Sequence, residues 1–238
     1  MDISVIVTAY NIAAYLGEAL ASVLAQTYPA AEVIVLDDGS TDEGATARVA
    51  QGFGARVRYV YQPNAGIGAA RNAGAAAARG SHLAWLDGDD YWEPEKLATQ
   101  VAALKADPTL EAAFCYIRQF ISPDIAGTPA AAGLQAPLEA MPGRCASTLL
   151  LTRPAWERTG LFATGVAVSE FLDWYARAGE AGVRMVMTPE ALAWRRIHAG
   201  NNSRRRSQEI REYAQILKAA LDRRRAAGKA GDPANGGG

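Results

Sequence analysis

Three carboxylates within four residues, at Asp87-Gly88-Asp89-Asp90, are the strongest sign of chemistry in this sequence. They follow the apolar run of residues 83–86, which is typical of a buried strand, so the acids come at the strand's carboxyl end. Crowded carboxylates raise one another's pKa unless a cation shares their oxygens, as magnesium does when it also holds substrate phosphates. The alternative is a polar turn before a helix at Pro94, since Asp and Gly are frequent in turns.

Polar groups follow three earlier apolar segments in the same way. These groups are Thr8-Ala9-Tyr10-Asn11 after residues 3–8, Asp37-Asp38-Gly39-Ser40 after residues 33–36, and Asn64-Ala65-Gly66 after residues 57–61. Because strands alternate with helical segments, we predict a parallel sheet with helices on both faces and its strand-end loops along one edge. The four polar groups should therefore lie in one crevice.

The elements that must position these groups follow from apolar periodicity and from capping residues. We predict helices over residues 13–26, from a Ser40 or Thr41 cap to about residue 51, over 66–79, 94–105 and 170–182, and further strands over 82–86, 147–152, near 185–187 and over 192–196. Residues 122–143 are rich in Pro, Gly and Ala without periodicity, which indicates a mobile loop.

Composition limits the class of protein. The chain has 238 residues, half of them apolar, which is enough for one large α/β domain, and its net charge of −1 gives no argument for nucleic-acid binding. Cys115 and Cys145 form neither a metal spacing nor a disulfide framework, so we expect core residues in a reducing compartment. We expect a soluble, cytoplasmic protein, because no signal peptide or membrane-spanning run is apparent.

The last part of the chain is basic. Arginines at 204–206 and 223–225 flank apolar positions at helical spacing, and we predict a basic amphipathic helix over residues 204–227 and a disordered Gly-rich tail over 228–238. Such a helix could lie on an anionic membrane, peripheral to its inner face. Docking on its own domain is the interpretation that we favour.

The ordered segments VIVTAYN, AYL, QTYP, EVIVLDDGSTD, NAGIGAARNAG and LDGDD resemble the family-two, GT-A-fold, nucleotide-sugar glycosyltransferases over roughly the first hundred residues. The resemblance implies an α/β, GT-A-like, Rossmann-type and mostly parallel sheet flanked by helices. It implies metal-dependent transfer, with inversion, of a sugar from a nucleoside diphosphate, which we expect to be UDP, to an acceptor hydroxyl. The transferase would be of hexosyl or N-acetylhexosaminyl type, with Mg²⁺ or Mn²⁺ as its cofactor.

The resemblance also assigns donor-binding residues. The matching positions are Thr8, Ala9, Tyr10 and Asp38 for the base, Gly66 and Arg71 with Asn72 for the nucleotide and phosphates, and Asp87, Gly88 and Asp89 for the Asp-x-Asp motif. Asp89 would bind the metal that bridges both phosphates, Asp87 would reach the ribose and metal region, and Asp90 would support them or cap a helix. Taken singly, Tyr10 could pack on the sheet, Asp38 could cap a helix, and Arg71 could be solvated.

The acceptor hydroxyl needs a general base. The family usually supplies Glu-Asp at a helix start, followed by an arginine, but counting back from Arg177 places Phe171 where that Asp should stand. Asp173 lies four residues before Arg177, a spacing that favours an intrahelical ion pair. We therefore predict Glu170 as the base, with Asp173 as the alternative.

Residues 195–203 resemble the closing segment of the family, in which His198 would complete the metal site. The alternative is an exposed histidine beside a loop, because a lone His is not a metal motif. His82, at a strand start, is assigned no role.

Two other functions remain open. The altered Phe171 position is compatible with a nucleotide-sugar-binding protein that lacks efficient turnover. A dinucleotide-dependent oxidoreductase is disfavoured, because Arg71 occupies the third glycine position of its fingerprint and the segment follows the third strand.

We divide the chain into a GT-A domain over residues 1–203, with a nucleotide-sugar half (1–106) and an acceptor half (107–203), before the C-terminal helix. The sequence leaves open the sugar, the oligomeric state and the acceptor, which could be a saccharide, a lipid-linked saccharide or a peptide. We expect acceptor choice to depend on residues 122–143.

Overall fold

The structure is a computed structural model that describes residues 1–137, 139–166, 170–198, 200, 218 and 223. Its strands are β1 (Ile3–Ala9), β2 (Glu32–Asp38), β3 (Arg58–Gln62), β4 (His82–Asp87), β5 (Tyr91–Trp92), β6 (Ala112–Ile121), β7 (Met141–Pro142), β8 (Leu150–Thr152) and β9 (Met185–Ile197). Its α-helices are α1 (Ala13–Leu24), α2 (Ala45–Gln51), α3 (Ile67–Ala77), α4 (Lys96–Ala106), α5 (Arg153–Thr159) and α6 (Glu170–Glu180).

One sheet joins the strands in the order β3-β2-β1-β4-β8-β6-β9-β5, with β7 paired to β6. The strands β3, β2, β1 and β4 are mutually parallel, as predicted from the strand–helix alternation. Every residue of β1 is buried, which explains why this strand is largely apolar rather than alternating between apolar and polar residues. The chain direction reverses at β8, which is antiparallel to both β4 and β6.

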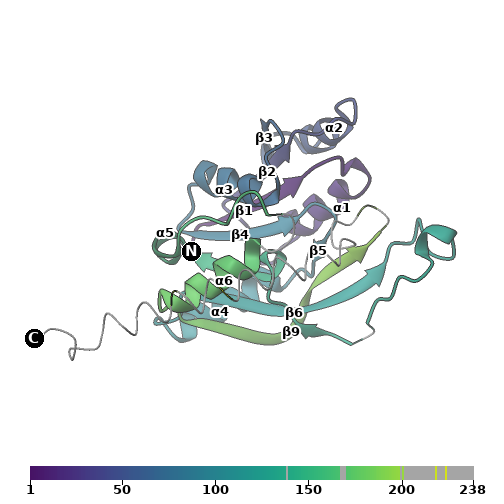
Figure 1. Ribbon diagram of the computed structural model, residues 1–238. Coiled ribbons are helices and arrows are strands. Elements are labelled where there is room, and N and C mark those ends of the chain that lie inside the picture. The colour runs from purple at the N-terminus through teal and green to yellow at the C-terminus, as the bar shows by residue number, and fades with distance from the viewer. Residues whose placement is uncertain (138, 167–169, 199, 201–217, 219–222, 224–238) are drawn as a thin grey trace, which may run out of the picture.

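Helices cover both faces of the sheet and enclose two apolar cores (Figure 1). The helices α1, α2 and α4 pack on one face, and α3, α5 and α6 pack on the other. The strands β6 and β9 run side by side and parallel, and β9 ends beside the segment that follows β6. The carboxyl ends of β1, β2, β3 and β4 thus share one edge with the last residues of β9.

Several predicted boundaries are corrected. Neither Ser40 nor Thr41 caps α2, which begins after Gly44 in a left-handed conformation (φ 77°), because both hydroxyls instead accept hydrogen bonds from Asn11. The expected strand over residues 147–152 starts as a 3₁₀ turn at Ala146–Thr148. The two short strands predicted between residues 185 and 196 are one strand, β9, with irregular pairing near its middle.

The segment after β6 contains more structure than a loop. A 3₁₀ turn at Pro129–Ala131 and the short β7 lie within residues 122–143. Apart from Lys218 and Arg223, which are both helical, the predicted C-terminal helix and tail lie outside the described residues. The division of the chain into domains therefore stays a prediction.

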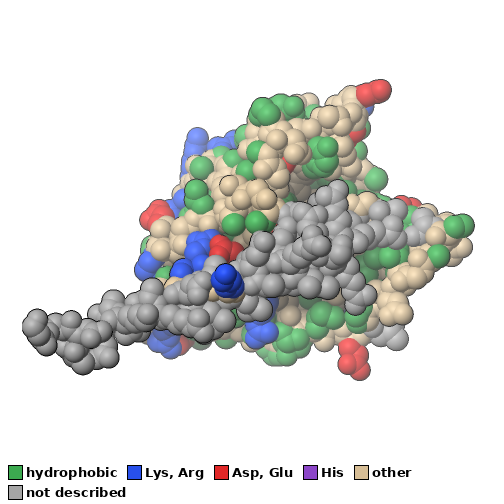
Figure 2. Space-filling view, viewed as in Figure 1, with side chains coloured by type: hydrophobic (Ala, Val, Ile, Leu, Met, Phe, Trp, Pro, Cys, Tyr) green, Lys and Arg blue, Asp and Glu red, His purple; other side chains and the backbone are tan. Residues whose placement is uncertain are grey.

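The surface and the cysteines agree with the composition. Basic and acidic side chains are interspersed over the described part of the face in Figure 2. No helix in the described ranges is both long and apolar enough to cross a membrane. Cys115 is buried in the core and Cys145 packs against it, and burial raises the pKa of the Cys145 thiol to about 11.

Candidate active site

The turn that follows β4 lies against the end of β1. Thr8 and Asp87 are paired across the two strands, and the Gly88 N–H donates to the Thr8 carbonyl at 2.9 Å. A Cβ atom on Gly88 would stand 2.8 Å from that carbonyl oxygen, so only glycine allows this approach. The strand order reverses between β1 and β4, which is where open α/β sheets bind ligands.

Ser147 fixes the turn from the side of β8. Its hydroxyl accepts from the Asp87 N–H at 3.2 Å and donates to the Asp90 carboxylate at 3.0 Å. Sequence reasoning assigned Ser147 only to a strand, and no motif marks its contact with residues sixty positions earlier. The serine thereby joins both ends of the acidic turn.

Asp90 is a buried anchor rather than a helix cap, because α4 begins only at Lys96. Its carboxylate also accepts the Arg196 N–H at 3.1 Å. Burial raises the pKa of Asp90 well above its ordinary value, and the charges of Asp89 and Asp87 act in the same direction. One member of the acidic run is therefore used for structure.

Asp89 lies beside His198. Nε2 of the imidazole is 3.0 Å from Asp89 Oδ2, and Nδ1 accepts the Gly200 N–H at 3.2 Å, so in the neutral ring Nε2 carries the proton. The His198 ring is buried and lies 4.8 Å from the Tyr15 ring, centroid to centroid. The interpretation of His198 as an exposed loop residue is therefore wrong.

The donor atoms fit a hard divalent cation in part. Two neighbouring ligands of an octahedral ion, each at about 2.1 Å, lie about 3.0 Å apart, and the facing Asp89 and His198 atoms are separated by 3.0 Å. An ion could take the place of the proton between them only after the ring proton moves to Nδ1 and the Gly200 N–H moves away from that nitrogen. No cluster of three or more His, Cys, Asp or Glu side chains suited to a metal occurs in the described part of the chain. A Mg²⁺ or Mn²⁺ ion here would need further ligands from phosphates, as such ions commonly do in nucleotide sites.

Arg71 links the acidic turn to α6. Its guanidinium donates to Asp87 Oδ1 at 2.7 Å and to Glu170 Oε1, and only 4% of the residue is exposed. The reading of Arg71 as a solvated helix residue is therefore wrong. Burial acts to raise the pKa of Asp87, but the charge and hydrogen bond of Arg71, helped by a bond from Thr8, hold it below its ordinary value. Asp87 thus stays ionised, with 35% of its side chain exposed.

The two base candidates have different surroundings. Glu170 is buried with Oε1 on Arg71, and its Oε2 has no hydrogen-bond partner among the described residues. Asp173 accepts from Arg177 at 2.8 Å, which is the ion pair that the sequence spacing predicts, and its other oxygen lies 3.8 Å from Arg223. The Glu170 carboxylate is the one that shares a partner with the acidic turn.

Phe171 lies in the apolar core at the position where the family usually has Asp. Its ring packs against Phe114, Phe162, Trp174 and Tyr175 with centroid separations between 5.9 and 6.3 Å. A carboxylate at this position would be surrounded by the carbon of these four rings. The departure from the family pattern therefore replaces a polar residue with a packing residue.

The expected nucleotide-binding positions lie at the ends of β1, β2 and β3. Tyr10 is 50% exposed and so does not simply pack on the sheet, whereas Thr8 and Ala9 are buried. The Asp38 carboxylate accepts the N–H groups of Ala65 and Gly66, each at 2.9 Å, just before α3. Asp38 therefore shapes the third loop, and the loops that the sequence placed together do meet.

Asn72 makes a contact that the sequence did not indicate. Its amide donates to the Phe162 carbonyl and accepts the Phe162 N–H, both at 2.9 Å. A Cβ atom on Gly68 would stand 2.1 Å from the Ala163 carbonyl oxygen. These contacts hold the chain before α6 against α3, which places Glu170 next to Arg71.

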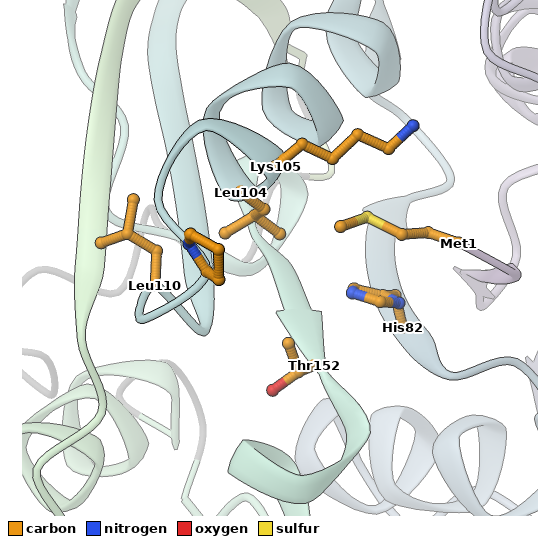
Figure 3. Close-up of a pocket in the computed structure, with 7 residues that line it drawn as sticks. Met1, His82, Leu104, Lys105, Leu110 and Thr152 are labelled. Carbon is orange, nitrogen blue, oxygen red and sulfur yellow. The ribbon is translucent and has the colours of Figure 1, made fainter.

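A pocket of about 390 Å³ lies at the other end of β4 (Figure 3). Met1, His82, Leu104, Lys105, Pro108, Leu110 and Thr152 line it. His82 starts β4 and Asp87 ends it, so the strand separates this pocket from the acidic turn. Its lining is largely apolar and has no carboxylate, so this pocket is distinct from the candidate active site.

Residues 4–130, more than half of the chain, match the model of the family described as glycosyl transferase family 2. The chain belongs to glycosyl transferase family 2. This confirms the resemblance seen in the sequence, and the match contains all four strand-end loops. It gives no support to the dinucleotide-dependent oxidoreductase.

The relatives are much longer than this family 2 chain. The "uncharacterized glycosyltransferase RC0461" of Rickettsia conorii is 45% identical over 102 residues, which are 43% of this chain and 17% of that protein. The chondroitin synthase of Escherichia coli is 26% identical over 231 residues, 93% of this chain and 33% of the synthase. The chain thus spans a third or less of these two proteins.

Solved structures of the same type confirm the GT-A fold. S. aureus TarS, residues 1–349 in complex with UDP-GlcNAc, has a TM-score of 0.69 at 23% identity, covering 86% of this chain and 61% of that one. The mannosyltransferase PcManGT of Pyrobaculum calidifontis, in complex with GDP-Man and Mn²⁺, has a TM-score of 0.70 at 22% identity, covering 92% of this chain and 64% of that one.

Proposed function

We propose that the chain is a metal-dependent, inverting glycosyltransferase that moves a sugar from a nucleoside diphosphate, UDP above all, to an acceptor hydroxyl. The observation that carries the proposal is that Asp89 Oδ2 and His198 Nε2 lie 3.0 Å apart. The pair stands near the ionised Asp87, where the strand order of the sheet reverses. Oxygen and imidazole donors at that edge suit a cation that holds a diphosphate.

The donor would lie across the ends of β1, β2 and β4. In this proposal the exposed ring of Tyr10 offers a face to the base, with Thr8, Ala9 and Asp38 around it. Gly66 and Gly88 let the backbone approach the nucleotide, because both lack a side chain there. TarS with UDP-GlcNAc and PcManGT with GDP-Man support a nucleotide-sugar donor, and the choice of UDP rests on the family resemblance.

A cation would be held by Asp89 and His198, with Asp87 on the ribose side. When bound, Mg²⁺ or Mn²⁺ would supply Lewis-acid stabilisation for the charge that grows on the departing diphosphate. The Mn²⁺ in the PcManGT complex supports a divalent ion. Arg71 would contribute through Asp87 and Glu170, since its charge is already shared between these two carboxylates.

Glu170 is proposed as the general base. Its Oε2, which is buried and has no hydrogen-bond partner among the described residues, would take the proton of the acceptor hydroxyl as that hydroxyl attacks the anomeric carbon from the face opposite the diphosphate. Arg71 would hold the other oxygen and so fix the direction of the carboxylate. Asp173 remains the alternative, although its partners Arg177 and Arg223 give it a structural contact instead.

A release assay for the nucleoside diphosphate tests the donor, the turnover and the metal dependence in this proposal. The chain would be incubated with a panel of UDP- and GDP-sugars with Mn²⁺, with Mg²⁺, or with a chelator. Release of UDP from one sugar, abolished by chelation, is the expected result. Release that is unaffected by the chelator would contradict metal dependence.

A nucleotide-sugar-binding protein without efficient turnover is the second candidate. The burial of Phe171 among aromatic rings favours it, because the family's usual carboxylate is absent from that position. Binding of a nucleotide sugar in calorimetry without any release, with saccharide, lipid-linked saccharide and peptide acceptors all present, would support this candidate. A peripheral membrane contact through the basic C-terminal segment stays a separate proposal, tested by sedimentation with anionic vesicles.

A further inference from the structure

The Arg196 side chain lies at a junction of four segments of the chain. Its guanidinium donates to the Asp89 carbonyl at 3.0 Å, to Ser122 at 3.2 Å, and to the Glu18 carboxylate. The side chain is 6% exposed, whereas Glu18 is 57% exposed. Arg196 therefore reaches from β9 across the acidic turn to α1 and to the start of the segment after β6.

Two aromatic rings complete this surrounding. The guanidinium carbon lies 4.7 Å from the ring centroids of both Tyr15 and Phe120, distances at which a cation is attracted to a ring face. Tyr15 in turn donates to Asp124 at 2.8 Å and contacts the ring of His198. The two rings thus restrict the plane of the guanidinium, and Tyr15 also restricts the position of the imidazole.

Arg196 also holds the turn through its backbone, because its N–H donates to the Asp90 carboxylate at 3.1 Å. One residue of β9 therefore binds two successive residues of the acidic turn, through the Asp89 carbonyl and the Asp90 side chain. His198, two residues further along the chain, faces the Asp89 carboxylate. The spacing of Asp89 from His198 is set by a strand and a turn that Arg196 ties together.

We propose that Arg196 is a positioning residue that sets the Asp89 carboxylate relative to His198 for a divalent cation with its nucleoside diphosphate. This rests on the proposed roles of Asp89 and His198. A planar guanidinium donates in fixed directions to the Asp89 carbonyl, Ser122 and Glu18, whereas a lysine ammonium on its flexible stem cannot make the same three contacts. Loss of the guanidinium should leave the fold in place but remove the side-chain hydrogen bond that holds the Asp89 carbonyl.

The test compares Arg196→Lys and Glu18→Gln with the unchanged chain. UDP binding would be measured by calorimetry with Mn²⁺ and with a chelator, and amide hydrogen exchange over residues 87–92 would be measured without ligand. Arg196→Lys should weaken UDP binding with Mn²⁺ by roughly tenfold, the scale of one lost charged hydrogen bond, and leave metal-free binding unchanged. Exchange over residues 87–92 should quicken in both variants, and more in Arg196→Lys.

Arg118→Lys is the matched control. Arg118 stands on the neighbouring strand β6, paired with Trp194, and lies over that ring at 5.5 Å, exposed and without a contact to the turn in the described residues. It should match the unchanged chain in UDP binding and in exchange. If Arg118→Lys had the same effect as Arg196→Lys, the loss would be a general effect of replacing arginine on this sheet, and the proposal would be overturned.

The remaining outcomes separate this inference from the proposed function. If the unchanged chain binds UDP more tightly with Mn²⁺ and Arg196→Lys does so equally well, the inference fails and the proposed function stands. If the unchanged chain shows no Mn²⁺-dependent binding, the proposed function fails and the metal-positioning role fails with it. The amide exchange rates over residues 87–92 then still show whether Arg196 holds the turn. If exchange in both variants is as slow as in the unchanged chain, Arg196 does not hold the turn either.

Discussion

At the scale of single residues, Arg71 has the most consequential contacts. The helix α3 carries it, β4 carries Asp87 and α6 carries Glu170, yet the three charges form one connected group in which Arg71 and Glu170 are buried. Removing Arg71 would leave both carboxylates without their counterion, which costs more than an ion pair contributes, whereas removing one carboxylate leaves the other paired. The proposed donor and acceptor sides of the site are therefore tied to each other electrostatically.

Asp89→Asn should abolish the Mn²⁺-dependent rise in melting temperature that UDP produces, because an amide oxygen is a weaker ligand for a hard cation than a carboxylate. Thermal melts with UDP, with and without Mn²⁺, measure this effect. Asp107→Asn is the control, since Asp107 is an exposed acid beside Arg184. An unchanged rise in Asp89→Asn would remove Asp89 from the site.

Glu170→Gln should keep donor binding while turnover falls by roughly 10²–10⁴-fold, the usual contribution of a general base. The glutamine amide keeps one oxygen to accept the hydrogen bond from Arg71. Its NH2 group, in place of the second carboxylate oxygen, cannot take the proton from the attacking hydroxyl. The measurement is the turnover number together with UDP affinity. Asp173→Asn serves as the comparison, and it should remain active. A collapse in Asp173→Asn with full activity in Glu170→Gln would transfer the role of base to Asp173.

At the scale of elements, the close packing of α3 on β1 brings Arg71 to the site. A Cβ atom on Gly74 would stand 2.3 Å from Ile6 Cγ2, inside the core of the sheet. The alanine-rich sequence allowed the helix to be predicted, since alanine is the strongest helix former. No local pattern marks the role of the glycines within it, because their close contacts are with β1 and with the chain before α6.

Gly74→Ala should therefore destabilise the protein, even though alanine favours a helix by up to about 1 kcal/mol over glycine. Overpacking of a filled core costs roughly 1–3 kcal/mol, so the clash outweighs the helical preference. Gly179→Ala in α6 is the control, because no described residue lies within 4 Å of its Cβ position, and this substitution should stabilise the protein. Urea unfolding compares the two, and a stabilised Gly74→Ala would contradict the packing argument.

At the scale of the whole molecule, one buried charge should make stability depend on pH. Burial lowers the pKa of Lys96 from 10.5 to about 8, and its Nζ lies 2.9 Å from Gln100 and 3.9 Å from the Trp92 ring centroid. Between these pH values the unfolded chain binds more protons than the folded one, so stability rises with pH. This rise in the free energy of unfolding is at most about 3 kcal/mol, because the Trp92 ring favours the charged form of Lys96.

Urea unfolding at pH 8, 9 and 10 measures this dependence against Lys96→Met, which removes the charge and keeps an unbranched side chain. The free energy of unfolding should rise from pH 8 to 10 in the unchanged chain relative to the variant. Groups such as Tyr59, whose pKa is raised by burial and by Asp37, are common to both proteins and cancel in the comparison. A constant difference between the two proteins would show that Lys96 stays charged throughout.

The sequence by itself determined the parallel half of the sheet, its helices and the edge at which Asp38, Asp87 and Asp89 gather, because strand and helix periods and loop order are local properties. Only the tertiary structure decided which charges meet. Arg71 lies between Asp87 and Glu170, Ser147 and Arg196 hold the acidic turn, and Phe171 enters the aromatic core. These contacts join residues that are distant in the chain. Which residues meet depends on how β9 and α6 pack against the parallel strands β1 to β4, and no local pattern determines that packing.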